Sequence, residues 1–382
     1  MAKKKLLFFS IFIIIILVFV LTIYNIIYKN NNIYLNNKDA APNFISIMLE
    51  ETASSGEYKV SKSNKWPSKG YVFNKEMSYC NNGSTLTWNE NDNSVSVNIN
   101  KTDKCYVYFD IYQPTQPTLA EYIKSQYTGT QGENSLYYHN STLTNGAGDN
   151  SYRYAGASDS VNNYICLGSD EATCPEANLF RIIGVFGDKT KVIRAKSVGY
   201  QQWHTSADNT WSSSSLNAYL NGTYLTSLGT IAEKIATTTW KVGGCSWSNI
   251  KTSVPKIVYK NEVGSSASTT TVDKKIGLMY ISDYYYSASP SAWTLVGYNK
   301  SDATKDYSAA KTINWLYLGS KEWTISRVSD ETFSAFIVDG SGHVFSYNVN
   351  FSNFAVRPSF NLDSTVTYVS GDGTKSNPIR IN

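Results

Sequence analysis

Hydrophobic residues in this chain are concentrated first in one long run and then in many short ones. The long run, Leu6–Ile27, contains no charged residue, and three lysines at positions 3–5 precede it. At about 1.5 Å per residue it gives roughly 33 Å of helix, enough to cross a hydrocarbon core of about 30 Å. Lysines before such a helix favour a cytoplasmic N-terminus. The pattern predicts a single-pass transmembrane helix with the rest of the chain outside the cell.

A cleaved signal peptide is the main alternative for this run. Its apolar region is usually about 7–15 residues long, and small residues mark a cleavage site soon afterwards. Here the run is longer, and the first small pair, Ala40-Ala41, is distant. No cysteine follows closely, as a lipoprotein would need, and the type IV prepilin pattern is missing. We therefore expect an uncleaved signal-anchor over residues 1–28, with the cell membrane itself as a partner of Leu6–Ile27.

The next two segments differ in their polarity pattern. Residues 29–65 are rich in Asn, Lys and Ser and are interpreted as a stalk, with a short helix near Phe44–Leu49. In residues 66–113 apolar and polar positions alternate, as in Val95–Ile99 and Cys105–Phe109, which is typical of strands with one buried face. We predict a small antiparallel β module of sandwich type there, followed by a linker at Pro114 and Pro117.

Residues 114–382 show mixed helix and strand signals and are predicted to form one domain. Thr118 and Glu121 have the spacing of a capping box, which predicts a helix to about Tyr127. Asn178–Val198 is the strongest hairpin, and two helical patterns follow it, at Leu216–Leu220 and from a second capping box at Thr230–Glu233. Residues 240–270 are expected to be loop. Further short strands are predicted over Ile276–Tyr286, Trp315–Leu318, Trp323–Val328, Ala335–Val338, His343–Val349 and Val356–Phe360.

Three motifs carry a resemblance to known families, covering about residues 118–382. They are Trp323-Thr-Ile-Ser-Arg327, Asp339-Gly-Ser-Gly-His-Val344 and Val356-Arg-Pro-Ser-Phe-Asn-Leu362. With the opening strand Asn178–Val185 and the closing segment from Ser370 to Ile381, they resemble an uncharacterised bacterial surface-protein family. The order of elements resembles the C-type-lectin-like fold, which the formylglycine-generating enzymes share.

The resemblance implies a fold class and no activity. It implies an α+β chain, with the transmembrane helix and β module followed by a lectin-like domain of short strands and two helices. The calcium- and sugar-binding motif of true C-type lectins is absent, and so are the paired cysteines of the formylglycine enzymes. Since a fold does not fix function, neither sugar binding nor catalysis follows from it.

The composition bears on which partners are expected and on whether the cysteines are oxidised. The net charge of +4 includes no long basic run, so nucleic acid is not an expected partner. Outside the membrane thiols oxidise, and we predict local disulfides Cys80–Cys105 and Cys166–Cys174, with Cys245 left over. A zinc site is the alternative, but no Cys-x-x-Cys pair exists and the three histidines are scattered. No cofactor or metal is expected.

Aromatic residues make up 14% of the chain and supply the candidate ligand surface. Tyr284, Tyr285 and Tyr286 are consecutive, so on a strand they would face both sides and expose at least one ring. Together with Trp293 they are the predicted aromatic patch for a sugar or a partner peptide. Arg357 is a further candidate that would position a ligand anion. A structural ion pair or carbonyl contact on the closing strand is the alternative for Arg357 and is favoured.

One enzymatic alternative rests on Cys245. A cysteine beside His204 or His343 would form a nucleophilic thiolate. Its surroundings, Gly243-Gly-Cys-Ser-Trp247, have only a distant likeness to papain-like proteases. We therefore expect a non-enzymatic extracellular protein of the cell envelope that binds or adheres to a glycan, an envelope polymer or a surface protein. A cell-envelope hydrolase using Cys245 or a carboxylate, and a structural component without a small ligand, are the alternatives.

Overall fold

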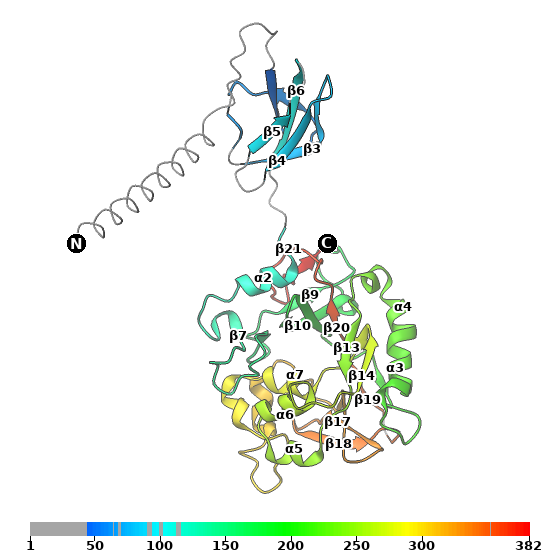
Figure 1. The fold of residues 1–382 in the computed structure, drawn as a ribbon. Helices are drawn as coiled ribbons and strands as arrows, with labels where there is room; N and C mark the ends of the chain where they lie inside the picture. The colour runs from blue at the N-terminus through cyan, green and yellow to red at the C-terminus, as the bar shows by residue number, and fades with distance from the viewer. Residues whose placement is uncertain are drawn as a thin grey trace, which may run out of the picture. The chain divides into compact units, whose positions relative to one another are not determined.

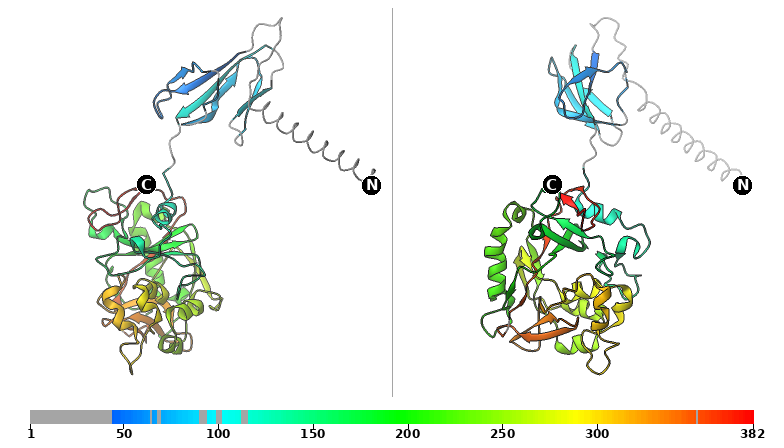
Figure 2. Two further views of the ribbon diagram at one scale, coloured as in Figure 1. Left: turned by 90° about the vertical axis from the view of Figure 1, so that its left-hand side faces the viewer. Right: turned by 180° about the vertical axis from the view of Figure 1, so that it is seen from behind.

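The computed structural model describes residues 44–63, 65–67, 70–89, 94–98, 102–111, 116–351 and 353–382. The chain divides into two compact units, residues 1–115 and 116–382, each described here by itself. Both are built mainly from short strands, and the few helices make the chain α+β, as expected (Figures 1 and 2). None of the helices within these ranges is long and apolar enough to span a membrane. The predicted transmembrane segment Leu6–Ile27 lies outside the described residues.

A four-stranded sheet and a separate hairpin form the first unit. The sheet has the order β2-β1-β6-β3, and β4 pairs with β5 in the hairpin. The strands are β1 Phe44–Glu50, β2 Tyr58–Val60, β3 Tyr71–Cys80, β4 Thr85–Asn89, β5 Ser94–Asn98 and β6 Lys104–Ile111. Side chains of the hairpin pack on the sheet around Ile47, Val107 and Phe109, which gives two layers.

The structure corrects two expectations for this unit. Residues 44–50 form strand β1, where a stalk with a short helix was predicted, and β1 runs parallel to β6, so the module is not purely antiparallel. The reason is the alternation of Ile45, Ile47 and Leu49, which turns all three onto the unit's core. The predicted disulfide is confirmed: Cys80 and Cys105 are direct cross-strand partners of β3 and β6 and are bonded.

Two sheets organise the second unit. The first has the order β15-β20-β11-β10-β8-β7, with β9 also paired to β10, and the second has the order β12-β19-β16-β17-β18. The strands of the first are β7 Leu136–Tyr138, β8 Tyr152–Tyr154, β9 Tyr164–Cys166, β10 Leu179–Phe186, β11 Lys189–Arg194, β15 Ile276–Gly277 and β20 Ser359–Leu362. Those of the second are β12 Tyr200–Gln201, β16 Glu322–Arg327, β17 Ser334–Val338, β18 Val344–Asn348 and β19 Phe354–Ala355. Two small ribbons complete the unit, β13 Thr238–Lys241 with β14 Thr271–Lys274 and β21 Tyr368–Ser370 with β22 Arg380–Ile381.

Short helices connect these strands. They are α2 Leu119–Ser125, α3 Ser215–Tyr219, α4 Leu225–Ser227, α5 Trp247–Thr252, α6 Pro255–Glu262 and α7 Ile281–Tyr286. Turns of 3-10 type occur at η1 Glu133–Ser135, η2 Glu176–Asn178, η3 Trp211–Ser213, η5 Gly229–Glu233, η6 Pro290–Thr294 and η7 Tyr307–Ile313, and a π-helical turn, η4 Leu220–Tyr224, joins α3 to α4.

The predictions of helices, of the hairpin and of the loop over residues 240–270 have different outcomes. The capping box before α2 is confirmed, with Thr118 and Glu121 bonded reciprocally, and so is the β10–β11 hairpin. The capping box predicted at Thr230 is wrong, because this segment continues from α4 as a 3-10 turn without a side-chain cap. The loop expected over residues 240–270 contains α5 and α6, and the strand expected over Ile276–Tyr286 is mostly α7.

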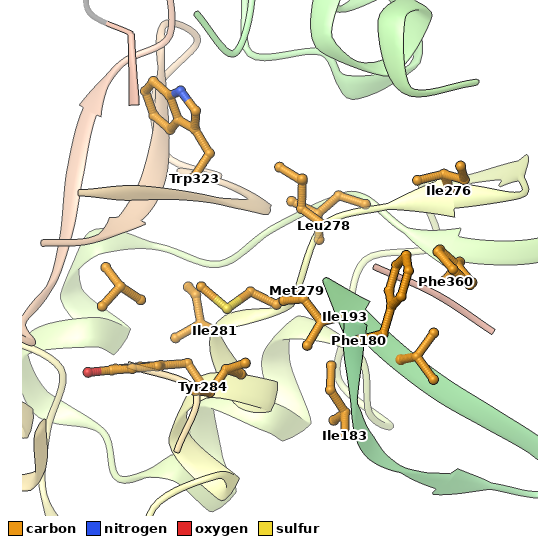
Figure 3. Close-up of a cluster of buried hydrophobic side chains, with 14 of the residues drawn as sticks. Phe180, Ile183, Ile193, Ile276, Leu278, Met279, Ile281, Tyr284, Trp323 and Phe360 are labelled. Carbon is orange, nitrogen blue, oxygen red and sulfur yellow. The ribbon is translucent and has the colours of Figure 1, made fainter. Parts of the chain in front are cut away.

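The hydrophobic core of the second unit lies where the two sheets and α7 meet. Figure 3 shows Met279 and Ile281 lying between Phe180 and Phe360 of the first sheet and Trp323 of the second. All five side chains are fully or almost fully buried. The start and the end of this unit lie side by side, because the Leu119 N–H donates to the Val366 carbonyl and the Tyr368 N–H to that of Pro117.

Candidate functional site

A pocket of about 580 Å³ lies beside the C-terminal segment of the second unit. Its volume is within the range of roughly 300–1,000 Å³ that small-molecule sites occupy. One wall comes from the loop that leads into β9 and the other from the loop between β21 and β22. The lining side chains are mostly hydroxyl, amide or charged: Ser158, Asp159, Val161, Asn162, Tyr164, Thr374, Lys375 and Ser376.

Backbone contacts hold the two walls of the pocket together. The Tyr164 N–H donates to the Gly373 carbonyl at 2.8 Å, and the Ile379 N–H donates to the Tyr164 carbonyl at 2.9 Å. Gly373 has φ +79°, and a Cβ there would lie 2.4 Å from the Asn162 carbonyl oxygen. Only glycine fits this close approach, so the pocket's shape is built into the sequence.

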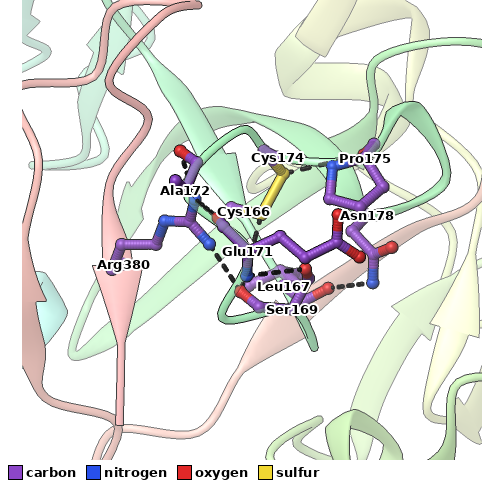
Figure 4. Close-up of a disulfide and its surroundings, with 9 residues drawn as sticks. All are labelled: Cys166, Leu167, Ser169, Glu171, Ala172, Cys174, Pro175, Asn178 and Arg380. Carbon is purple, nitrogen blue, oxygen red and sulfur yellow. Dashed lines mark hydrogen bonds between the residues drawn. A yellow bond between two sulfur atoms is a disulfide. The ribbon is translucent and has the colours of Figure 1, made fainter.

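The wall containing Tyr164 is anchored at its far end by the second disulfide (Figure 4). Cys166, the last residue of β9, is bonded to Cys174, which confirms the predicted pairing. Arg380 of β22 donates to the carbonyls of Ser169 at 2.5 Å and Glu171 at 2.6 Å, inside the loop that this disulfide closes. The disulfide therefore closes the loop after this wall, and the Arg380 hydrogen bonds tie that loop to β22, the strand that follows the other wall.

A buried arginine lies directly behind the lining. Arg181 of β10 is 4% exposed, and its guanidinium donates to the Ser158 hydroxyl at 2.8 Å and to the Val161 carbonyl at 2.9 Å. It also donates to the Asn163 side-chain oxygen at 2.6 Å and stacks between the rings of Tyr164 and Trp315, at 4.3 and 4.6 Å. All of these acceptors are neutral.

No carboxylate among the described residues forms an ion pair with Arg181. Burial lowers the pKa of Arg181 to about 10, with Arg357 acting in the same direction and Tyr164 against it. The guanidinium is still protonated at neutral pH. Lys375 and Asp159 in the lining carry opposite charges, and Arg181 adds a positive charge behind the lining. Hydroxyls, amides and such a field suit a polar ligand that carries an anionic group.

Residues 187–364 match the family model of DUF6273, a domain of unknown function. No curated protein matches the chain, and no solved structure does. The DUF6273 match agrees with the expected likeness of the C-terminal part to an uncharacterised domain family. The pocket's lining residues, at 158–164 and 374–376, flank the DUF6273 segment on both sides.

Within the DUF6273 segment, the predicted aromatic patch does not exist as a surface. Tyr284, Tyr285 and Tyr286 are at most 1% exposed, and so is Trp293. The three tyrosines lie on helix α7, which is enclosed on every side by α6, β16 and η6, so its apolar positions need not follow one face. The prediction that one ring is exposed was wrong.

These aromatic side chains have structural partners. The Tyr284 hydroxyl donates to the Gly342 carbonyl at 3.0 Å and that of Tyr286 to the Asn145 carbonyl at 3.2 Å. The Trp293 indole donates to the Ala288 carbonyl at 3.0 Å. Their role in this structure is core packing, and they do not contribute to the pocket.

Arg357 has the structural role that the sequence favoured. It is 3% exposed, and its Nε and Nη2 donate to the two carboxylate oxygens of Glu322 at 2.6 and 2.7 Å. Nη2 also donates to the Leu316 carbonyl at 2.6 Å. This bidentate pair joins the segment that enters β20 to the start of β16, and so links the two sheets.

Cys245 lacks the surroundings of a nucleophile. The thiol is buried, and burial first, then the charge of Glu262, raises its pKa well above the ordinary value. His343 contacts Asp306 at 2.8 Å and Asp339 at 3.3 Å, and His204 accepts a backbone N–H from Ser206. Within the described residues, no hydrogen bond joins either histidine to Cys245.

One group of metal-ligand side chains is close enough to share an ion in the part of the chain that the structure describes: Cys80, Asp103 and Cys105. Its two sulfurs form the first disulfide, and Asp103 accepts the N–H groups of Asn82 and Ser84. These atoms are already used structurally, so they do not form a metal site.

Sequence reasoning did not find the pocket. It named no site residue in 158–164 and described Ser370 to Ile381 only as a closing segment. Arg181 was counted as part of a hairpin strand. The available signal was an arginine within the apolar run Leu179–Phe186, since a charged residue in a buried strand has to be explained by partners elsewhere.

Proposed function

We propose that the protein is a membrane-anchored, extracellular component of the cell envelope that binds an anionic group of a glycan or another envelope polymer. The binding site is the pocket between residues 158–164 and 374–376. The observation that carries this proposal is the buried, protonated Arg181 behind the pocket, which has no carboxylate partner among the described residues.

The location is supported by the cysteines and by the start of the sequence. Two disulfides, one in each unit, suit an oxidising compartment. The charge-free run Leu6–Ile27 after three lysines is typical of a signal-anchor with its N-terminus in the cytoplasm. Together they favour a single-pass protein with both disulfide-bonded units outside.

A lectin-like scaffold is part of the proposal. The order of a hairpin, helices, a long irregular region and several short strands supports it, as does the pairing of the closing strand β20 with β11. Such a scaffold would present irregular loops for adhesion, and the pocket lies between two of them. The motif likeness to a bacterial surface family is a further part of the proposal, and it accords with the DUF6273 match.

The charges at the pocket determine whether a substitution should strengthen or weaken anion binding. Arg181 attracts an anion through the lining, Lys375 adds to that attraction, and Asp159 opposes it. Lys375 and Asp159 are both exposed, so replacing either should leave the fold intact. Each 1.4 kcal/mol of lost attraction corresponds to about a tenfold loss of affinity.

The test is a binding screen of the detergent-solubilised full chain against immobilised neutral glycans, carboxylated glycans and phosphate-containing envelope polymers. We expect binding to one anionic class, weakened by salt. K375E should reduce that binding about tenfold and D159N should increase it. K256E, which reverses an exposed lysine on α6 away from the pocket, is the matched control and should bind as the wild type does.

Three results would contradict the proposal. They are binding to none of the polymers, binding to neutral glycans with no effect of K375E, or an equal loss in K375E and K256E. The last would mean that only the overall charge of the protein matters. A hydrolytic product from any polymer would favour the enzymatic alternative.

A further inference from the structure

A buried lysine and a buried aspartate meet deep inside the second unit. Lys191 lies in the middle of β11 and Asp283 in the first turn of α7. The Lys191 Nζ is 2.5 Å from the Asp283 Oδ2, and the two side chains are 6% and 3% exposed. The partners are 92 positions apart in the sequence, so the contact ties a strand of the first sheet to the central helix.

The ammonium group of Lys191 has few polar contacts for a buried charge. Among the described residues its one hydrogen-bond acceptor is Asp283. Aromatic rings surround the rest of it, with Tyr280, Trp240 and Phe186 centred 4.5, 5.3 and 5.8 Å from Nζ. An ammonium can donate three hydrogen bonds and donates one here; the ring faces attract the cation, but burial favours the neutral amine.

Other buried pairs of the same unit are better satisfied. Arg357 makes two bonds to Glu322 and one to a carbonyl. Arg153 donates to Asp149 and to the Ser151 hydroxyl, and Asp149 is also bonded by Tyr259. Lys191 is thus the exception, and a purely ionic role does not account for its surroundings.

The electrostatics also favour a neutral amine. Burial lowers the pKa of Lys191, the Asp283 charge acts against this, and nearby Arg153 adds to the lowering. A second carboxyl group, Glu262 of α6, also acts against the lowering of the Lys191 pKa from the neighbouring helix. Burial raises the pKa of Glu262, while its oxygens accept the N–H groups of Ile281 and Ser282 and the Ser326 hydroxyl.

We propose that Lys191 and Asp283 become joined by an intramolecular amide bond between Nζ and the carboxyl carbon Cγ. A proton passes from the ammonium to the carboxylate within the pair, and the amine lone pair then attacks Cγ. The Tyr280 N–H, which donates to Oδ2 at 2.8 Å, stabilises the oxygen that becomes the amide carbonyl.

The other carboxyl oxygen, Oδ1, leaves as water after it takes two protons, the one that the ammonium first gave up and a second one from nitrogen after the attack. One C–N bond forms and one C–O bond breaks, so the step needs no oxidant, reductant or co-reactant. The product is neutral, which removes two charges from an apolar site. This covalent cross-link is independent of ligand binding at the pocket, since it would fix β11 to α7 inside the DUF6273 segment.

The decisive measurement is the mass of the full chain after its disulfides are reduced. The wild type should be lighter than its sequence mass by one water molecule. Trypsin does not cleave after a lysine whose amine is acylated, so digestion should yield one branched peptide that joins residues 190–194 to residues 276–300, in place of linear peptides that end at Lys191 or begin after it. A wild-type chain of full sequence mass, with the linear peptides recovered, would overturn the proposal without recourse to any variant.

Variants assign the mass loss to this pair. K191R keeps the positive charge but removes the amine, and D283A removes the carboxyl group, so neither should lose water. K196R is the matched control, because Lys196 forms an exposed ion pair with Glu176 at 2.6 Å and should leave the mass deficit unchanged. A deficit that persists in K191R would place the lost water elsewhere and contradict the assignment.

Discussion

Replacing Arg357 with Met should strongly destabilise the second unit. The substitution removes three hydrogen bonds and leaves the Glu322 carboxylate, 1% exposed, without its counter-charge. Breaking a buried ion pair from one side typically costs about 3–5 kcal/mol, because the remaining charge is neither solvated nor paired. Urea unfolding followed by tryptophan fluorescence measures this loss, and we expect a value in that range.

The double variant E322M/R357M separates the ion pair from the packing. With both charges removed and similar volume retained, stability should return close to or above that of the wild type. An exposed pair at the same distance, Lys196 and Glu176 at 2.6 Å, provides the matched control. Both of its side chains are more than 60% exposed, so K196M should change the free energy of unfolding by less than about 1 kcal/mol.

Two outcomes would refute this reasoning. If E322M/R357M is as unstable as R357M, the loss arises from shape and not from the unpaired carboxylate. If R357M keeps wild-type stability but no longer binds the envelope ligand, Arg357 is the anion-positioning residue that the sequence offered as its other interpretation.

Two further predictions concern the walls of the pocket and the buried Asp149. C166S/C174S removes the disulfide beside the Tyr164 wall and should lower the free energy of unfolding by about 2–3 kcal/mol. C245S, a substitution in the core, should leave polymer binding unchanged. Equal polymer binding by the two variants would mean that the disulfide does not shape the pocket. Burial opposes ionisation of Asp149, but Arg153 and hydrogen bonds from Ser151 and Tyr259 outweigh it and hold its pKa well below the usual range. Since unfolded aspartates titrate near about 3.9, the folded state binds this proton less readily, and the stabilisation is present above about pH 4 and lost as the pH falls further. D149N should flatten the acid limb of stability against pH, and an unchanged slope would contradict this.

Patterns in the sequence correctly predicted those elements that depend on residues close together in the chain. The apolar run Leu179–Phe186 and the turn after it specify the β10–β11 hairpin, and the Thr118–Glu121 spacing specifies the start of α2. The disulfides followed from short separations between cysteines in a chain expected outside the cell. Each of these depends on residues that lie near one another in the chain.

The helices after residue 240 were missed for two different reasons. For α5 and α6 the start signals are present, because Ser246 caps one and Pro255 opens the other, but the polar composition of the region outweighed them. Helix α7 gave no helical pattern, since a fully enclosed helix need not be amphipathic and its tyrosines have strand propensity. Tertiary packing decided its conformation.

The candidate sites could not be predicted because they are assembled across long sequence separations. Arg181 depends on Trp315, 134 residues away, and Lys191 on Asp283, 92 residues away. In the sequence Arg181 is the one cation of an apolar strand, whereas Lys191 shares its strand with Lys189 and Arg194. The position of Arg181 alone indicates that a partner is needed, without saying whether the partner is a carboxylate, a set of carbonyls or a ligand.

The position of the DUF6273 segment separates the two proposals. Lys191, Glu262 and Asp283 lie inside residues 187–364, whereas the pocket's lining and Arg181 lie outside them. The cross-link would therefore lie within the matched residues, and the anion pocket is lined by residues on either side of them. The two proposals depend on different polar residues, so loss of water without anion binding, or anion binding without loss of water, is a consistent result. Each proposal can fail while the other stands.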